Sequence, residues 1–507
     1  MEKTKVNNKR IIKNTLFLYF RMIVIMAINL YTVRAVLHQL GVVDYGIYNV
    51  VGGVVSMFSF LNSTLATSSQ RYFSIELAKG DLKRLNQWFS LNITTFAIII
   101  LIFIVIAETV GLWFVNTQMT IPEDRMFAAN VVYQLSIVTF CIHFINIPYN
   151  ALIIAHERMS IFAYFSIIDA ILKLVIVFML TISTWDKLIV YGALMLLTSC
   201  LNTSFYVIYN TRKFVESKYR LYWQTSEVKE LLSFSGWHLF GTFSTVIRSQ
   251  GINILLNMFF NPAINAARAV AFQVYHAVSQ LSSNFFVAVK PQIYKSYAAG
   301  EYKDLYNLIL RSTSISSFLV SILIFPILMN TSFVLGLWLK MVPDYTVVFT
   351  QLMLINGLID ATNGPSAAAA LSTGKIKNYE LLVATVILLN LPFSYIALKL
   401  GAEPTATMVI SIMISLITTA SRAYMVNRLI GMPLYRYAIM YIRLIAASLV
   451  VWFVMHISVY EVEVTFLKYL VNALFVIMLI VISYAVMVFE KNDIIYVYNF
   501  VMRRLKK

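Results

Sequence analysis

The sequence predicts an all-α integral membrane protein with about fourteen transmembrane helices. Of its 507 residues, 60% are hydrophobic and only 12% are charged, whereas soluble domains are about 45–50% apolar and about 25% charged. The apolar residues form blocks of roughly 18–28 residues, which is the length of helix that crosses a hydrocarbon core about 30 Å thick. This composition excludes most soluble enzymes, secreted disulfide scaffolds and disordered tails, and we expect a protein that is not an enzyme.

The predicted spans are separated by charged residues and by Gly or Pro breaks. They lie near residues 14–39, 46–76, 88–115, 126–154, 160–183, 188–211, 231–259, 265–290, 309–338, 345–372, 379–400, 405–427, 437–458 and 465–489. Alternate loops hold 28 of the 40 basic residues on one side of this map and 5 on the other. Because basic residues concentrate in cytoplasmic loops, this split supports an even number of spans and predicts that both termini are cytoplasmic. The net charge of +17 is spread over loops, which argues against a nucleic-acid-binding surface.

Short sequence motifs recur in the same order in the two halves of the chain. Residues 78–85 resemble residues 298–305, Gly111-Leu112-Trp113 recurs as Gly336-Leu337-Trp338, and His156-Glu157-Arg158 corresponds to Thr373-Gly374-Lys375. Six spans separate equivalent positions, so we expect two parallel six-helix repeats. We predict an N-terminal lobe over 1–220, a C-terminal lobe over 221–432, and two extra C-terminal helices with a basic tail over 433–507. A two-lobed repeat of this kind is typical of transporters.

Four arginines lie inside predicted spans with no acidic residue one helical turn away: Arg21, Arg34, Arg248 and Arg268. An ionisable group at membrane depth is costly, so it faces the bundle interior, pairs with another group or touches a substrate. Guanidinium groups bind phosphate through paired donors, and the four together predict a polyanion site. Salt bridges between helices are the alternative. On a straight helix Arg21 and Arg34 would point about 140° apart, so a shared cavity requires a bend.

Polar side chains follow single helical faces in the second half of the chain. Gln273, His276, Gln280 and Asn284 form one such stripe, and Asn356, Asp360 and Asn363 form another, followed by a helix break at Gly364-Pro365. Gln250, Asn253 and Asn257 form a third stripe, from which Arg248 is expected to point away. Amides both donate and accept hydrogen bonds, so Gln273, His276, Gln280 and Asn356 are predicted to bind sugar hydroxyls. Hydrogen bonding between helices is the alternative.

Two intramembrane acids are candidates for ion coupling, Asp169 and Asp360. Asp169 stands four residues before Lys173, so the two can also form a structural pair on one helix face. The sequence has no zinc motif and no phosphate-binding Gly-rich loop, and the two cysteines, Cys141 and Cys200, fall inside apolar segments. We therefore expect no metal, no cofactor and no catalytic residue, and the energy source would be a proton or sodium gradient, a partner protein, or the substrate gradient itself.

Several segments carry a resemblance to a known family. They are Arg34–Leu37, Leu40–Tyr48, Gln70-Arg71-Tyr72, Asn150-Ala151-Leu152, His156-Glu157-Arg158 and Thr373-Gly374-Lys375. With its length and span number, the whole chain resembles the bacterial polysaccharide (Wzx-type, O-antigen or capsule) flippases of the multidrug/oligosaccharidyl-lipid/polysaccharide exporter superfamily. The segment Leu40-Gly41-Val42-Val43-Asp44-Tyr45-Gly46-Ile47-Tyr48 is the most specific of these features.

The resemblance implies two lobes forming a V in the bacterial inner membrane, and alternating access. The implied cargo is an undecaprenyl-pyrophosphate-linked oligosaccharide that moves from the cytoplasmic to the outer leaflet. The arginines would hold the pyrophosphate, and the partners would be the lipid-linked glycan, membrane lipid and the polysaccharide polymerase machinery. A lipid II flippase and a cation-coupled multidrug antiporter are alternatives. A membrane-embedded glycan polymerase or ligase is a third, but such enzymes carry a large outer loop that the sequence lacks.

Overall fold

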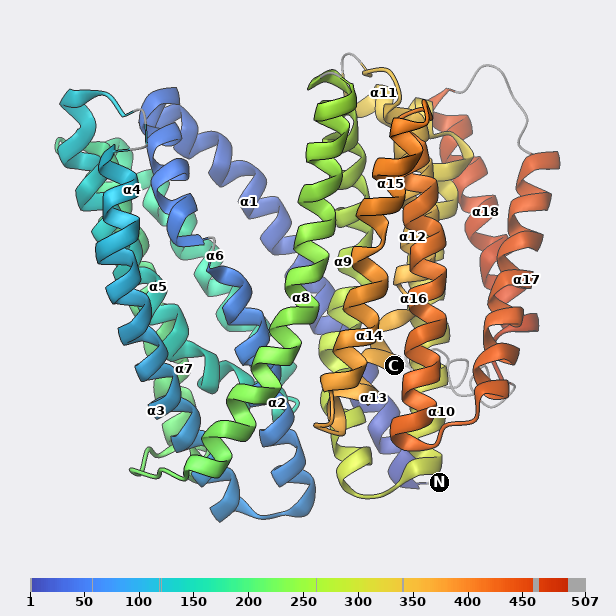
Figure 1. Ribbon diagram of the computed structural model, residues 1–507, viewed down its shortest axis with the longest axis horizontal. Coiled ribbons are helices and arrows are strands. Elements are labelled where there is room, and N and C mark those ends of the chain that lie inside the picture. The colour runs from blue at the N-terminus through green and yellow to red at the C-terminus, as the bar shows by residue number, and fades with distance from the viewer. Residues whose placement is uncertain are drawn as a thin grey trace, which may run out of the picture. The chain divides into compact units, whose positions relative to one another are not determined.

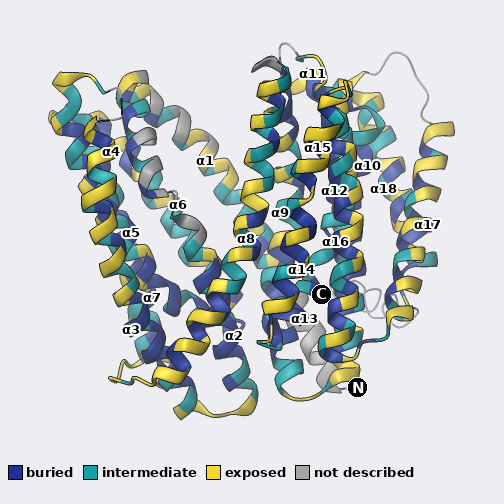
Figure 2. Cartoon of the chain, in the orientation of Figure 1, coloured by how far each residue is buried: buried dark blue, intermediate teal, exposed yellow. Residues whose placement is uncertain are grey.

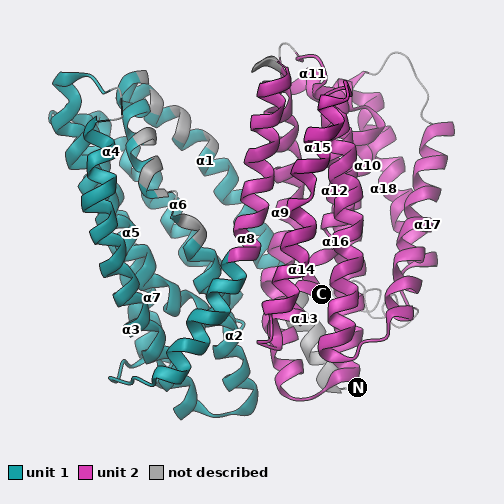
Figure 3. Ribbon diagram, in the orientation of Figure 1, with its two compact units in different colours: residues 1–239 teal, residues 240–507 magenta. Residues whose placement is uncertain are grey.

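The computed structural model describes residues 2–56, 58–117, 119, 121–260, 262–339, 342–458 and 465–490, and every regular element in these ranges is a helix (Figure 1). The predicted all-α class is therefore confirmed. The chain forms two compact units, residues 1–239 and 240–507, which are coloured separately in Figure 3. The basic tail at 491–507 lies outside the described residues.

Unit 1 begins with one very long helix. Its elements are α1 (Glu2–Ser56), α2 (Ser59–Lys79), α3 (Leu82–Ile106), the π-helical turn Ala107–Gly111, α4 (Leu112–Thr117), the short turn η2 (Glu123–Arg125), α5 (Met126–Ala155), α6 (Met159–Ile182), α7 (Lys187–Lys213), the turn η3 (Val215–Ser217), and the first part of α8 (Thr225–Phe259). Inside α1, Gly41 has a non-helical backbone (φ 76, ψ 170), so the helix changes course there. This break falls in the predicted gap between spans 1 and 2, and the second predicted span is divided between the end of α1 and α2.

Unit 2 contains the rest of α8 and all later helices. They are α9 (Pro262–Ala298), α10 (Tyr302–Met329), α11 (Thr331–Trp338), α12 (Thr346–Asp360), α13 (Asn363–Ser372), α14 (Lys377–Leu388), α15 (Asn390–Lys399), α16 (Ala406–Ile430), α17 (Leu434–Ser458) and α18 (Phe466–Met487). The helix break expected at Gly364-Pro365 lies just before these residues, at 361–362 between α12 and α13, and Pro365 stands in the first turn of α13. Both α17 and α18 pack against α10, and they therefore belong to the same compact unit as the second repeat.

Nine helical segments in the described ranges are long and apolar enough to cross a membrane. Many of the large side chains on α3, α17 and α18 are exposed and apolar, among them Leu101, Phe453 and Leu474, and exposed stretches appear in yellow in Figure 2. Apolar exposed faces suit contact with lipid. The predicted spans that do not meet this test are those around α1, α2, α8, α9 and α12–α13, which include the helices that carry the intramembrane arginines and the amide stripes.

The turns that link the repeated motifs have the same backbone geometry in both halves. Gly80 ends α2 with φ 76, and Gly300 follows α9 with φ 71. The turn after α5 has Glu157 at φ 59, and the turn after α13 has Gly374 at φ 74. A residue in the left-handed region thus stands at both pairs of matching positions, as is common where a helix ends.

Polar groups on α3 hold the connector that follows α7. The Asn86 side-chain amide donates to the carbonyl oxygens of Glu216 (2.8 Å) and Lys218 (2.7 Å), and the Ser90 hydroxyl accepts from the backbone N–H of Arg220 (3.1 Å). Asn86 and Ser90 are four residues apart, so they lie on one face of α3. An extended connector is therefore bound along the helix rather than left free.

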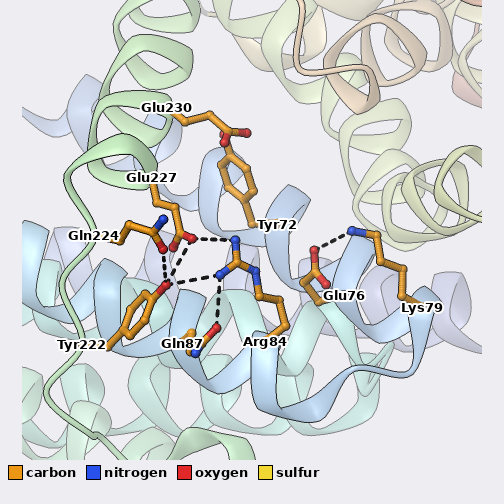
Figure 4. Close-up of polar contacts among 9 residues, drawn as sticks. All are labelled: Tyr72, Glu76, Lys79, Arg84, Gln87, Tyr222, Gln224, Glu227 and Glu230. Carbon is orange, nitrogen blue, oxygen red and sulfur yellow. Dashed lines mark hydrogen bonds and ion pairs between the residues drawn. The ribbon is translucent and has the colours of Figure 1, made fainter.

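Side chains of α2 and α3 also form polar contacts with the start of α8 (Figure 4). Arg84 forms an ion pair with Glu227 (2.5 Å) and donates to the Tyr222 hydroxyl (3.2 Å), which itself donates to Gln224 (2.6 Å). The Tyr72 hydroxyl donates to Glu230, one turn further along α8 (3.2 Å). These contacts hold the first turns of α8 in unit 1. The boundary between the units consequently lies at residues 239–240 inside α8, where the sequence had suggested a boundary at 220.

The segment Leu40–Tyr48 acquires a structural role through Arg125. The Arg125 guanidinium binds both oxygens of Asp44 (2.8 and 2.6 Å) and both oxygens of Asp186 (2.6 and 3.2 Å). Asp186 also accepts from the backbone N–H groups of Leu188 and Ile189, and so caps α7. One arginine thereby joins the end of the Gly41 bend to the starts of α5 and α7.

The Arg125–Asp186 contact makes the stability of unit 1 depend on pH. The Arg125 guanidinium, which donates to this carboxyl, is the main cause that holds the pKa of Asp186 below its ordinary value of 3.8. A depressed folded-state pKa stabilises the fold above pH 3.8, and this stabilisation is lost as the pH falls through the folded-state pKa. We expect the thermal midpoint of the detergent-solubilised protein to fall less steeply below pH 3.8 in Asp186→Asn than in the wild type. Parallel curves for the two proteins would contradict this expectation.

A second local feature is the π-helical turn between α3 and α4. The hydroxyl of the fully buried Tyr133 donates to the carbonyl oxygen of Ala107 (2.7 Å) and so satisfies a group at the start of the wider turn. A Cβ on Gly111 would lie 2.0 Å from that hydroxyl. Glycine is therefore required here by the close approach of Tyr133.

Replacing Gly111 with Ala is expected to lower the stability of unit 1 by about 2–3 kcal/mol, because the hydroxyl and the carbonyl would both lose a buried partner. The matched control is Gly336→Ala at the equivalent position of the second repeat, where nothing lies within 4 Å of an added Cβ. Thermal unfolding of both variants in the same detergent measures the difference. Equal midpoints would show that Tyr133 does not require the glycine.

Candidate functional site

A cavity of about 360 Å³ lies inside unit 2, and each helix around it contributes both polar and apolar side chains to the lining. Its lining comes from α8 (Thr245, Val246, Arg248, Ser249, Gln250, Ile252), α9 (Arg268, Phe272, Tyr275), α12 (Leu352, Met353, Asn356) and α16 (Met408, Ser411). Cavities of this size hold small ligands or the head of a larger one. Among these described lining residues there are two arginines and no acid.

The two arginines differ in how far they are buried. Arg268 is only 5% exposed, whereas Arg248 is half-buried. An Arg268 Nη1 group donates to the side-chain oxygen of Asn253, and the buried Arg268 Nε has no hydrogen-bond partner among the described residues. The two guanidinium groups lie close enough to interact as like charges. A buried N–H donor without a partner is costly, so the cavity is prepared for an acceptor that the chain itself does not supply.

Asp360 lies at the end of α12 and receives hydrogen bonds from two residues that line the cavity. Its Oδ2 accepts from the Tyr275 hydroxyl (3.0 Å) and from the Asn356 amide (2.7 Å), and its Oδ1 accepts from Ser415 (3.4 Å). No described basic group forms an ion pair with this carboxyl. Asp360 is therefore held by neutral donors next to the cavity.

The structure brings together three of the predicted site residues, Arg248, Arg268 and Asn356. It does not bring Gln273, His276 or Gln280 to them. Gln273 and His276 are exposed and Gln280 is half-buried, and none of the three lines the cavity. The physical reason is the helical period, because the α9 face formed by Arg268, Phe272 and Tyr275 is turned about 100° from the predicted stripe.

Arg248, which was expected to point away from the α8 amide stripe, lines the cavity together with Gln250 of that stripe. Arg248, Ser249, Gln250 and Ile252 all line the same cavity. Side chains from several sides of α8 therefore line the cavity. A stripe pattern predicts one polar face for each helix, so the sequence did not predict this arrangement. Tyr275 and Ser411 were not selected from the sequence, although Tyr275 follows Arg268 by seven residues, or two helical turns.

The other predicted residues lie in unit 1. The Arg21 guanidinium lies over the Phe162 ring at 4.6 Å, and its buried Nε has no hydrogen-bond partner among the described residues. The side chain of Arg34 falls outside the described residues. Lys173 donates to Asp169 (2.7 Å), as the spacing of four residues suggested. Asp169 is thus already neutralised, unlike Asp360.

Metal ligation finds no support in the described ranges. No group of three or more His, Cys, Asp or Glu side chains gathers there, and Cys141 and Cys200 are free.

No family model and no curated protein matches the sequence. Among solved structures, a multidrug resistance MATE family transporter of the MOP superfamily in an outward-facing conformation has a TM-score of 0.71 and 12% identity, covering 84% of this chain and 96% of that one. A point mutant of a MATE transporter has the same TM-score and identity, with 83% and 96% covered.

A further match is a MOP superfamily transporter from Pyrococcus furiosus, at a TM-score of 0.65 and 11% identity, with 83% of this chain and 96% of that one covered. The reverse polarity of the binding pocket in that transporter suggests a different function for it. At such low identity the likeness concerns the fold. The chain therefore has the fold of the MATE transporters of the MOP superfamily.

Proposed function

We propose that the protein is a transporter of an anionic lipid-linked substrate, a polyprenyl-pyrophosphate-linked oligosaccharide carried from the cytoplasmic to the outer leaflet. One observation carries the proposal. Arg268 is buried beside Arg248 in the unit 2 cavity, has a partnerless Nε, and meets no acid in the described lining. Burying a charge beside a like charge without a counter-charge is costly, so an anionic ligand is the simplest compensating partner.

The chemistry of the lining suits the head of such a substrate. Guanidinium groups bind phosphate oxygens through paired donors, and a pyrophosphate offers enough oxygens for two arginines. Gln250, Ser249 and Thr245 add amide and hydroxyl groups for the first sugar. A volume of about 360 Å³ fits the pyrophosphate and part of the glycan, while the polyprenyl tail stays in lipid. A lipid II carrier shares this pyrophosphate chemistry and remains within the proposal.

A multidrug antiporter is the second candidate function, because structural neighbours include a multidrug resistance transporter. Export of a cationic drug through this cavity is disfavoured, since Arg248 and Arg268 would repel it. The neighbour whose pocket has reverse polarity gives a precedent within the same fold for a different kind of ligand. The positive charges of Arg248 and Arg268 therefore favour an anionic substrate over a cationic drug.

Coupling to a proton or sodium gradient would use Asp360 rather than Asp169. Lys173 already neutralises Asp169 at 2.7 Å. Asp360 has only neutral donors and no described basic partner, so it can gain a proton or a cation without breaking an ion pair. A carboxyl at membrane depth with this environment is a suitable coupling group.

Reconstituted vesicles distinguish the two functions. The purified protein is placed in liposomes with a fluorescent short-chain polyprenyl-pyrophosphate disaccharide, and a parallel set receives a cationic dye. We expect translocation of the glycolipid, loss of translocation in the Arg248→Gln/Arg268→Gln double variant, and no dye efflux. The exposed Arg443→Gln on α17 is the matched control. Dye efflux without glycolipid movement would overturn the proposal.

A further inference from the structure

The connector between α7 and α8 (residues 214–224) has one side held in unit 1. Glu216 is buried and pairs with His156 of the turn after α5 (2.7 Å), and the His156 ring is stacked on the Phe214 ring with the ring centroids 4.0 Å apart. At its other end the connector is held by the contacts of Arg84 (Figure 4). The fold therefore determines which side chains of this α7–α8 connector face outward.

The outward side of the α7–α8 connector is both apolar and basic. Its exposed large apolar or aromatic side chains are Val215, Tyr219, Leu221 and Trp223. The exposed bases in the connector and in the last turn of α7 are Arg212, Lys213, Lys218 and Arg220. Leu221 is 83% exposed, so this apolar surface is not the covered edge of a core. Aromatic and basic side chains together are typical of the membrane–water interface.

The positive charge of this surface is not balanced by the acids around it. None of the four exposed bases forms an ion pair with a described residue. The one acid between residues 212 and 224 is Glu216, which is buried and paired with His156. The next acid, Glu227, is also buried and is paired with Arg84. The four bases therefore attract an anionic surface from outside the chain.

Contacts with α3 place the α7–α8 connector along the first turns of that helix. Asn86 and Ser90 bind the backbone of the connector, and the Thr94 hydroxyl is hydrogen-bonded to the Tyr219 hydroxyl (3.1 Å). The three α3 residues are spaced by four, so they lie on one face and cover about 12 Å of the helix axis. The connector thus lies against α3 itself rather than beyond its end.

Beyond Thr94 the same face of α3 is exposed and apolar. Ile98, Leu101 and Val105 are all exposed and lie within about 40° of Thr94 around the helix axis. Exposed apolar side chains continue to Phe114, about 24 Å along the axis from Ile98. A hydrocarbon core about 30 Å thick would therefore begin about four residues earlier, near Thr94. This comparison places the α7–α8 connector at the depth of the lipid headgroups.

We propose that the α7–α8 connector binds anionic lipid headgroups of the cytoplasmic leaflet, with its bases on the lipid phosphates and with Leu221 and Trp223 at the boundary of the acyl chains. The leaflet follows from the basic loops at this end of the helices. A position beside the apolar face of α3 favours lipid over an acidic soluble protein as the partner. All of these residues lie in unit 1, so the inference does not depend on the substrate of the unit 2 cavity.

Quenching of Trp223 by brominated lipid tests this site, because bromine quenches a tryptophan only at close contact. The full-length protein is placed in phosphatidylcholine vesicles that contain a minor fraction of brominated phosphatidylglycerol or, in a parallel set, of brominated phosphatidylcholine. The chain has 7 tryptophans, so Trp223→Phe is measured beside the wild type and the difference is the Trp223 signal. We expect an apparent preference of at least about tenfold for the anionic lipid, since each base near an anionic surface contributes about fivefold. High salt should reduce this preference.

The role of the bases is tested by Lys218→Gln/Arg220→Gln, which changes two exposed side chains and leaves the buried contacts of the connector in place. This variant should reduce the preference to about twofold or less, because two contributions of about fivefold are lost. The matched control is Lys303→Gln/Lys375→Gln, which removes two exposed bases of unit 2, at the start of α10 and after α13. It should keep the wild-type preference.

Each other outcome overturns the inference. If neither brominated lipid quenches Trp223, the connector faces water and a soluble partner replaces the lipid. If the two lipids quench it equally, the contact is apolar and no headgroup is bound. If Lys218→Gln/Arg220→Gln keeps the full preference, or if the control loses it as well, the connector is not the site of the anionic lipid.

Discussion

Replacing Arg268 with Met is expected to abolish binding of a pyrophosphate-carrying lipid without lowering the stability of the protein. The loss should be about 100-fold or more in affinity, because a desolvated charge-assisted contact contributes about 3 kcal/mol. Stability should stay nearly equal, since the loss of the Arg268–Asn253 hydrogen bond is offset by removal of a buried like charge beside Arg248 and of an Nε with no partner among the described residues. Fluorescence binding and thermal unfolding on the same preparation measure both effects.

This pair of readouts distinguishes a ligand-binding arginine from a structural one. A structural arginine supports its neighbours, so its removal would lower the unfolding temperature, as removal of one partner of a buried pair does. Arg443→Met, an exposed arginine of the same unit, is the control and should change neither quantity. A marked drop in stability with unchanged ligand affinity would assign Arg268 a structural role instead.

Removal of Arg125 is expected to cause the largest loss of stability in unit 1. Arg125→Ala would leave Asp44 and Asp186 close together without their shared cation, while four charge-assisted contacts are lost. We expect a cost of about 2–3 kcal/mol, less than for a fully buried network because the three side chains are partly exposed. The thermal midpoint of the detergent-solubilised protein should fall accordingly.

The second-site variant Asp44→Asn provides the control for Arg125. In the Arg125→Ala background it removes the repulsion between the two carboxylates and should restore part of the lost stability. In the wild-type background it should be destabilising. If Asp44→Asn has the same effect in both backgrounds, Arg125 and Asp44 do not interact energetically, and the role assigned to the Leu40–Tyr48 segment is wrong.

Most of the helix order could be predicted from apolar block length and from the breaks between blocks. The gap between α12 and α13 follows from Gly364-Pro365, and the turns at Gly80 and Gly300 follow from the repeated Gly-acid motif. Both rest on local chemistry that a sequence displays. The interruption at Gly41 also falls in a predicted gap between spans, whereas the division of the next predicted span between the end of α1 and α2 is not contained in the apolar pattern.

The candidate site was only partly predictable for a related reason. A charged side chain is costly inside a membrane, and this cost drew attention to the arginines within predicted spans, among them Arg248 and Arg268. Which face of α9 lines the cavity depends on how α9 packs on α12, and the close approach of Tyr275 to Gly357 sets that rotation. The stripe of Gln273, His276 and Gln280 has the right chemistry on a face that does not line the cavity. Periodicity identifies a face but not the helix that it meets.

The central claim is that Arg248 and Arg268 form the site for the pyrophosphate of a lipid-linked substrate. The most direct test is a structure determined by electron cryomicroscopy with a saturating short-chain polyprenyl pyrophosphate. The account predicts phosphate density within hydrogen-bonding distance of both guanidinium groups, including the Arg268 Nε. Phosphate density bound elsewhere, with the unit 2 cavity free of ligand, would contradict it.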